Sequence, residues 1–176
     1  MNILIDGVDA SGKSTVAHKL SDKLNMLEVR GSSFELADCT NEELYKHFTK
    51  VANLDNAIIQ RGIYSNRTYA TLYQDYAILS HEQRTTIEDK FKDNTVVIYL
   101  TAPEETIINR LEERGDDYVT TDKVSSILGL YKTVMTDAIS NSVAVLTYDT
   151  SKLSSDEIVE DIIKVIQEPE EHLSDE

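Results

Sequence analysis

Residues Gly7 to Ser14 read Gly-Val-Asp-Ala-Ser-Gly-Lys-Ser, which is a glycine, four residues, a second glycine, a lysine and a serine. An apolar run, Asn2 to Asp6, precedes this segment, and a helix-like stretch, Ser14 to Leu24, follows it. Glycines let the backbone curl so that successive N–H groups and the helix N-terminus surround a polyphosphate. A glycine-rich turn that merely contains a lysine is the alternative. The strand before and the helix after favour a phosphate-binding loop.

The residue types of this loop suit a polyphosphate that carries a metal ion. Lys13 is expected to reach the outer phosphates, and the Ser14 hydroxyl is expected to ligate Mg²⁺. The predicted phosphate-binding residues are Gly7, Ala10, Ser11, Gly12, Lys13, Ser14 and Thr15.

Composition limits the class of protein. At 176 residues with 40% hydrophobic residues, the chain suits one core and one domain. A net charge of -15 argues against binding to nucleic acid or to an anionic membrane, since both need basic surface. A nucleotide needs only a local cluster of cations. With a single cysteine, no signal peptide and no membrane-spanning run, a cytoplasmic protein is expected.

Apolar runs alternate with helix-like patterns along the chain. Strands are predicted at 2–6, 27–30, 57–60, 95–100 and 143–147, and helices at 13–25, 40–54 and 64–79 and from residues 80, 103 and 154. Capping-box pairs open three of these helices. The alternation predicts an α/β fold with a central parallel sheet of about five strands between helical layers. Residues 1–167 would form a single domain, followed by a flexible acidic tail at 168–176.

Arginines mark where a second anion could bind. Arg61 follows the strand 57–60, at the edge where ligands of such sheets collect. Arg110 and Arg114 lie one helical turn apart and share a face. Phosphoryl transfer needs cations on the donor, on the moving group and on the acceptor. The alternative for the helical pair is that each arginine pairs in solvent with neighbours such as Glu112 and Glu113.

Three blocks, in order along most of the chain, resemble the thymidylate kinases. The first is the loop that opens at Asp6, and the second runs Gln60-Arg61-Gly62-Ile63-Tyr64-Ser65-Asn66-Arg67-Thr68-Tyr69. The third runs from Tyr99-Leu100 through Pro103 to Arg110, Arg114 and Gly115. The segment between Arg30 and Asn56 looks shorter than usual, as in a compact viral form.

This resemblance implies a three-layer P-loop kinase fold with a lid near 110–123. It also implies an ATP- and Mg²⁺-dependent reaction that converts dTMP to dTDP, and a homodimer. Catalytic residues would be Lys13, Arg61, Arg110, Arg114 and Asp9. Because Ala10 stands where some members carry a loop arginine, charge stabilisation would come from the two lid arginines.

The resemblance also assigns acceptor-binding residues, which would be Asp9, Arg61, Asn66 and Tyr69. Phe34 is a further candidate, because its ring could stack on the acceptor base. Asp9 would face the sugar 3′-hydroxyl or a metal-bound water, and Arg61 would hold the monophosphate. Asn66 can donate to and accept from a base edge. Tyr69 would crowd a 2′-hydroxyl and so favour deoxyribose.

Each acceptor role has a structural alternative. Tyr69, Tyr73 and Tyr76 repeat at helical spacing, as in a packed aromatic face. Asn66 could cap the helix that begins near it. Phe34 and Phe48 could stack on a base or belong to the core.

Gln60 departs from the family pattern, which has an aspartate before the arginine. An amide supplies no charge to Mg²⁺ and accepts no proton at neutral pH. Either Asp9 or Glu35 compensates, or turnover is slow, or the chain binds nucleotide without turnover. A deoxynucleoside kinase is a further alternative, but its hydroxyl acceptor would want a carboxylate base where Gln60 stands.

Overall fold

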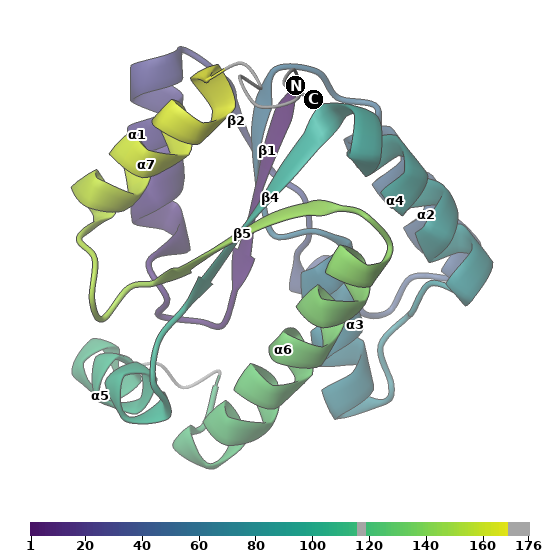
Figure 1. The fold of residues 1–176 in the computed structure, drawn as a ribbon. Coiled ribbons are helices and arrows are strands. Elements are labelled where there is room, and N and C mark those ends of the chain that lie inside the picture. Colours follow the sequence, from purple (N-terminus) through teal and green to yellow (C-terminus); the bar gives the residue numbers. More distant parts are fainter. Residues whose placement is uncertain (116–118, 169–176) are drawn as a thin grey trace.

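Five parallel strands form the centre of the computed structural model, which describes residues 1–115 and 119–168 (Figure 1). They are β1 (Asn2–Gly7), β2 (Leu27–Arg30), β3 (Ala57–Gln60), β4 (Thr95–Thr101) and β5 (Ala144–Asp149). Their order in the sheet is β2-β3-β1-β4-β5, and every neighbouring pair is parallel. This confirms the predicted α/β class with a five-stranded parallel sheet.

Helices cover both faces of the sheet because its central strands are apolar on both sides. Ile3 and Ile5 of β1 pack in one cluster with α1 (Lys13–Leu24) and α7 (Ser155–Gln167). Leu4 points the other way, into the larger cluster. That cluster includes residues of α2 (Asn41–Ala52), α3 (Ile63–Tyr73), α4 (His81–Asn94) and α6 (Val124–Ser140). The result is a three-layer α/β/α arrangement.

All three predicted capping boxes are present. Thr40, Ser80 and Ser154 each accept a bond from the backbone three residues later, and the Glu or Gln there returns one. In each case two backbone donors at the helix start are satisfied by side chains. These helix starts were predictable because the signal lies within four residues.

Several predicted boundaries were wrong. The helix expected over 64–79 ends at Tyr73, because Gln74 adopts a left-handed backbone with φ 58°. Pro103 is the residue before α5 (Glu104–Arg114), not part of its first turn. The last strand covers Ala144–Asp149 rather than 143–147.

The helix α6 was absent from the predicted elements. Its buried residues recur at helical spacing, so a local signal existed. Short 3₁₀ turns occur at Phe34–Leu36 (η1) and Thr121–Lys123 (η2). The proposed lid at 110–123 includes the end of α5 and η2, but its middle residues, 116–118, and most of the tail, 169–176, lie outside the described residues.

The strand order determines which segments lie on either side of the phosphate-binding loop. Because β1 lies between β3 and β4, the loop after β1 is flanked by the segments that follow β3 and β4. The helix α5 also lies at this carboxyl edge of the sheet (Figure 1). Ligands of open α/β sheets bind at this edge. Within 1–115 and 119–168, no helix has both the length and the apolar character that crossing a membrane requires.

Candidate nucleotide-binding site

The backbone of the loop after β1 depends on glycine. Gly7 has φ 148°, and a Cβ atom built there would lie 2.2 Å from the carbonyl oxygen of Leu100. Any side chain would therefore push β1 from β4. Gly12, with φ 91°, precedes α1 and offers no side-chain cap. The first amides of α1 are thus left to bind an anion at the positive end of the helix.

Lys13 lies against this loop. Its Nζ donates to the carbonyl oxygens of Gly7 at 2.8 Å and Val8 at 2.6 Å. Burial and the nearby charge of Arg61 lower the pKa of Lys13 to about 7. A phosphate beside the amine would favour its charged form.

Two loop hydroxyls suit a nucleotide with its metal ion. Ser11 Oγ is buried and lacks a hydrogen-bond partner within the described part of the chain. Ser14 Oγ donates to Gln60 Oε1 at 3.1 Å. Among residues 1–115 and 119–168, no group of three or more His, Cys, Asp or Glu side chains is placed so that it could hold a metal ion. A hydroxyl beside phosphate oxygens fits Mg²⁺, which is commonly held by few protein ligands and the substrate phosphates.

Asp9 and Arg61 meet at the β3 side of the loop. The guanidinium of Arg61 donates to Asp9 Oδ1, and the Tyr69 hydroxyl donates to Asp9 Oδ2 at 2.9 Å. Although burial raises the pKa of Asp9, the charges of Arg61 and Lys13 outweigh it and hold that pKa below its usual value. Arg61 itself has φ 62°. Such backbone strain in a non-glycine residue is typical of functional sites.

The residues predicted to face the acceptor sugar or base differ in their contacts and in their exposure. Asn66 donates its amide to the carbonyl oxygen of Ala77 at 2.9 Å, and it lies inside α3, so the helix-capping alternative was wrong. Tyr69 stacks on Tyr73 with ring centroids 6.3 Å apart, so the aromatic face exists alongside the Asp9 contact. Phe34 is 43% exposed and lines the cavity, whereas Phe48 is buried in the core.

Arg110 joins the loop to the segment after β5. Its guanidinium donates to the carbonyl oxygen of Ala10 at 3.2 Å, and to Thr150 Oγ1 at 2.8 Å and Thr150 O at 2.9 Å. These bonds replace the alternative in which Arg110 pairs with its helix neighbours. Arg114 lines the same cavity one turn later.

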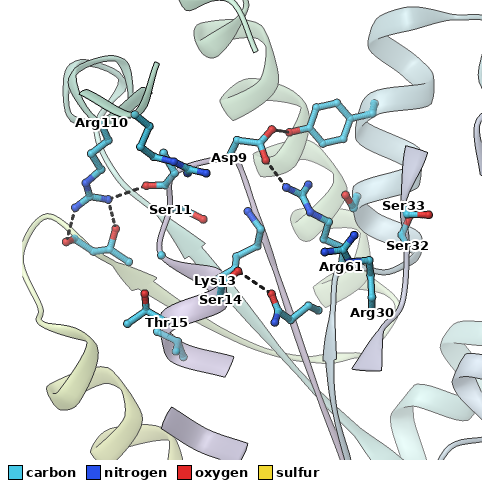
Figure 2. Close-up of a pocket in the computed structure, with 18 of the residues that line it drawn as sticks. Asp9, Ser11, Lys13, Ser14, Thr15, Arg30, Ser32, Ser33, Arg61 and Arg110 are labelled. Atoms are coloured by element: carbon cyan, nitrogen blue, oxygen red, sulfur yellow. Dashed lines mark hydrogen bonds and ion pairs between the residues drawn. The ribbon is translucent and has the colours of Figure 1, made fainter. Parts of the chain in front are cut away.

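One cavity of about 840 Å³ is lined by the loop residues from Asp9 to Thr15 and by Arg61, Asn66, Tyr69, Arg110 and Arg114. This is near the upper end of the roughly 300–1,000 Å³ that small-molecule sites span. Its charged lining residues are Lys13, Arg30, Arg61, Arg110 and Arg114, against Asp9 and Glu113. Figure 2 shows Arg30 and Arg61 on one side of Lys13 and Arg110 on the other. The cavity is thus basic in a chain of net charge -15.

Three residues of this region were missed as site residues. Arg30, at the end of β2, lines the cavity beside Gln60, its register partner in β3. Asp6 is fully buried and accepts hydrogen bonds from the backbone amides of Gly7, Gly62 and Ser65, and from the Tyr131 hydroxyl. A carboxylate in an apolar strand was its signal. Glu28 contacts Gln60 from β2, and no local pattern pointed to it.

Comparisons with known proteins place this geometry in context. A family described as AAA domain (AAA_18) matches residues 3–127. The SPβ prophage-derived protein YorR of Bacillus subtilis is 46% identical over 165 residues, which cover 94% of this chain and 98% of YorR. A crystal structure of YorR, described as a complex with phosphorylated GDP, superposes with a TM-score of 0.89 at 45% identity, covering 95% and 96% of the two chains.

More distant structures share the fold. Deoxyadenosine kinase from M. mycoides, with the products dCMP and dCDP, has a TM-score of 0.61 at 19% identity over 94% of this chain and 98% of its own. Thymidylate kinase from Candida albicans has a TM-score of 0.59 at 17% identity over 94% and 90%. The three-layer fold is therefore that of P-loop kinases.

Proposed function

We propose that this chain, which belongs to the AAA-domain family AAA_18, is an ATP- and Mg²⁺-dependent kinase of deoxynucleoside monophosphates. Its preferred acceptor would be dTMP. The observation that best supports this proposal is that basic residues line the cavity on both sides of the phosphate-binding loop. Arg110 and Arg114 lie on the side of β4 and β5, and Arg30 and Arg61 on the side of β2 and β3. Cations on both sides suit a reaction between two anions.

Each residue has a role that its position supports. Lys13 and the loop amides would bind the outer phosphates of ATP, and Ser14 would hold Mg²⁺, which neutralises phosphate charge when bound. Arg61 and Arg30 would bind the acceptor phosphate. Arg110 and Arg114 would stabilise the moving phosphoryl group or the donor phosphates.

A phosphate acceptor fits this site better than a hydroxyl acceptor. The phosphate is already an anionic nucleophile and needs no base, whereas a nucleoside hydroxyl needs one. Gln60 stands at the end of β3, and its amide cannot take a proton. Asp9 is engaged by Arg61 and Tyr69, and its lowered pKa makes it a weak base.

The acceptor sugar and base would lie beside α3 and η1. Tyr69, held by Asp9, would crowd a 2′-hydroxyl, and the remaining polar capacity of Asn66 would contact the base edge. Phe34, exposed on the cavity wall, would stack on the base. These contacts would favour a deoxyribonucleotide acceptor, and dTMP is the acceptor that the resemblance to thymidylate kinases suggests.

A coupled assay of nucleoside diphosphate release tests the proposal. All four deoxynucleosides and their monophosphates are offered as acceptors, with ATP and, because of the phosphorylated GDP in YorR, also GTP as donors. We expect turnover with ATP and dTMP. Turnover with thymidine but not dTMP would make the chain a deoxynucleoside kinase. Tight nucleotide binding without any turnover would make it a binding protein.

A further inference from the structure

A line of polar contacts leads from the loop serine to a carboxylate of β2. Ser14 Oγ donates to Gln60 Oε1 at 3.1 Å, and Gln60 Nε2 donates to Glu28 Oε1. The other oxygen of Glu28 lies 2.5 Å from His18 Nδ1. The Glu28 side chain is only 23% exposed, whereas that of His18 is 66% exposed. A negative charge thus lies one side chain behind the hydroxyl proposed to ligate Mg²⁺.

The fold places these groups together. Glu28 is the register partner of Ile58, and Gln60 follows Ile58 by two residues, so Glu28 and Gln60 share one face of the sheet. Ile58 packs in the cluster that includes residues of α1. Ser14 and His18 are four residues apart on α1 and therefore lie on one side of that helix. Strand register and helix spacing together fix the contacts.

Glu28 determines which way the Gln60 amide points. The NH₂ group is a donor and must face the carboxylate, so the carbonyl oxygen is left for the Ser14 hydroxyl. A hydroxyl that ligates a metal uses a lone pair for it and needs an acceptor for its proton. Gln60 Oε1 is that acceptor, and the charge of Glu28 strengthens it by polarising the amide.

We propose that Glu28 is a positioning residue for the Mg²⁺ of the bound nucleotide, acting through Gln60 on Ser14. It provides the negative charge that Gln60, in place of an acid, does not carry. Partners one step removed from a metal ligand commonly contribute 10- to 100-fold in metal affinity. The inference rests on the proposed Mg²⁺-dependent nucleotide binding, but not on which acceptor is used.

Calorimetric binding of ADP, with excess Mg²⁺ and with EDTA, tests this inference without turnover. The ratio of the two dissociation constants measures the coupling between metal and nucleotide. In Glu28→Gln we expect this ratio to fall about tenfold, with the EDTA value within about twofold of wild type. In Gln60→Ala the ratio should fall similarly. In the double variant Glu28→Gln with Gln60→Ala, the ratio should fall little further, because Glu28 acts on Ser14 only through Gln60.

Two further variants separate positioning from general stability. His18→Asn removes only the exposed partner of Glu28, and we expect the ratio to stay within about threefold of wild type. The pair Glu28→Gln with Gln60→Glu places the acid directly beside Ser14 and should restore most of the ratio. Urea unfolding of each variant checks that the fold is intact.

Three results would overturn the inference. The first is a Glu28→Gln variant that keeps the wild-type ratio. The second is a Glu28→Gln variant that loses as much ADP affinity in EDTA as with Mg²⁺. The third is a wild-type protein whose ADP affinity does not depend on Mg²⁺. Mg²⁺-dependent binding without phosphoryl transfer to any acceptor would contradict only the proposed reaction.

Discussion

At the scale of single residues, the site depends on charges brought close together. Lys13 and Asp9 come from the loop, and Arg61 comes from the end of β3. Arg61 and Lys13 lower the pKa of Asp9, Arg61 lowers and Asp9 raises that of Lys13, and Asp9 raises that of Arg61. Burial disfavours charge, and the contact with Arg61 favours the charged form of Asp9. Lys13 lies beside a second cation, and its pKa is lowered to about 7. Nucleotide phosphates would therefore bind beside charged groups that already interact, and would change how many protons these groups hold.

The pKa of Lys13 predicts how nucleotide affinity depends on pH. In the free protein it is lowered to about 7, and adjacent phosphates would raise it. Below about pH 7 the amine is already charged, so this group leaves affinity constant. Above that, binding must take up a proton, and affinity should fall by up to about tenfold per pH unit until the bound pKa is reached.

Calorimetry of ADP binding in two buffers with different ionisation heats would detect this proton uptake. The matched control is Lys13→Arg, whose guanidinium stays charged and should remove the uptake. Equal proton uptake in both proteins would assign it to another group.

The position of Arg61 predicts a selective defect in acceptor use. We expect Arg61→Ala to raise the KM for dTMP by roughly 10- to 100-fold, because a charged hydrogen bond contributes about 1.5–3 kcal/mol. ATP affinity should change little, since the donor would lie on the side of Arg110. Steady-state kinetics with each substrate varied would measure both. An equal loss of ATP affinity would show that Arg61 binds the donor.

At the scale of elements, Asp6 links β1 to the start of α3. Gly62 offers no side-chain cap, and Asp6 instead accepts from the amides of Gly62 and Ser65. Its other oxygen accepts from Gly7 and Tyr131. Burial raises the pKa of Asp6, and the amide of Gly7 and the charge of Lys13 oppose that rise. One buried carboxylate thus holds the strand, α3 and α6 in place around the cavity.

Asp6→Asn should therefore destabilise the protein. An amide has one acceptor oxygen, so two of the four donors would face an NH₂ group and lose their partner. At about 1–3 kcal/mol for each buried unsatisfied donor, the free energy of unfolding should fall by about 3 kcal/mol. Urea denaturation would measure it. Tyr131→Phe removes only one donor and should cost about 1 kcal/mol, and similar losses in both variants would argue against this network.

Elements with local signals could be predicted from the sequence, and contacts across strands could not. The residues of the phosphate-binding loop lie within eight positions of one another, and those of each capping box lie within four. The Asp9–Arg61 pair exists only because β1 and β3 are neighbours, and Arg110 reaches Ala10 across 100 positions. The contact between Glu28 and Gln60 likewise needs the register of β2 and β3.

At the scale of the whole molecule, the cavity is continuous from Arg30 to Thr150, with the phosphate-binding loop between them. The homodimer that the thymidylate-kinase resemblance predicts is a separate question from this lining. Light scattering would test that dimer separately. Two nucleotides bound at the two ends would have their phosphates adjacent over Lys13.

This continuity predicts tight binding of a ligand that joins both substrates. Adenosine and thymidine linked through a chain of five phosphates should bind about 10²- to 10⁴-fold more tightly than ATP, because the second half binds at high effective concentration. Calorimetry or competition with a fluorescent nucleotide would measure the gain. Arg61→Ala should remove much of that gain while ATP affinity stays near wild type. If the linked ligand bound no better than ATP, the two ends of the cavity could not be occupied together, and a monophosphate acceptor would be excluded.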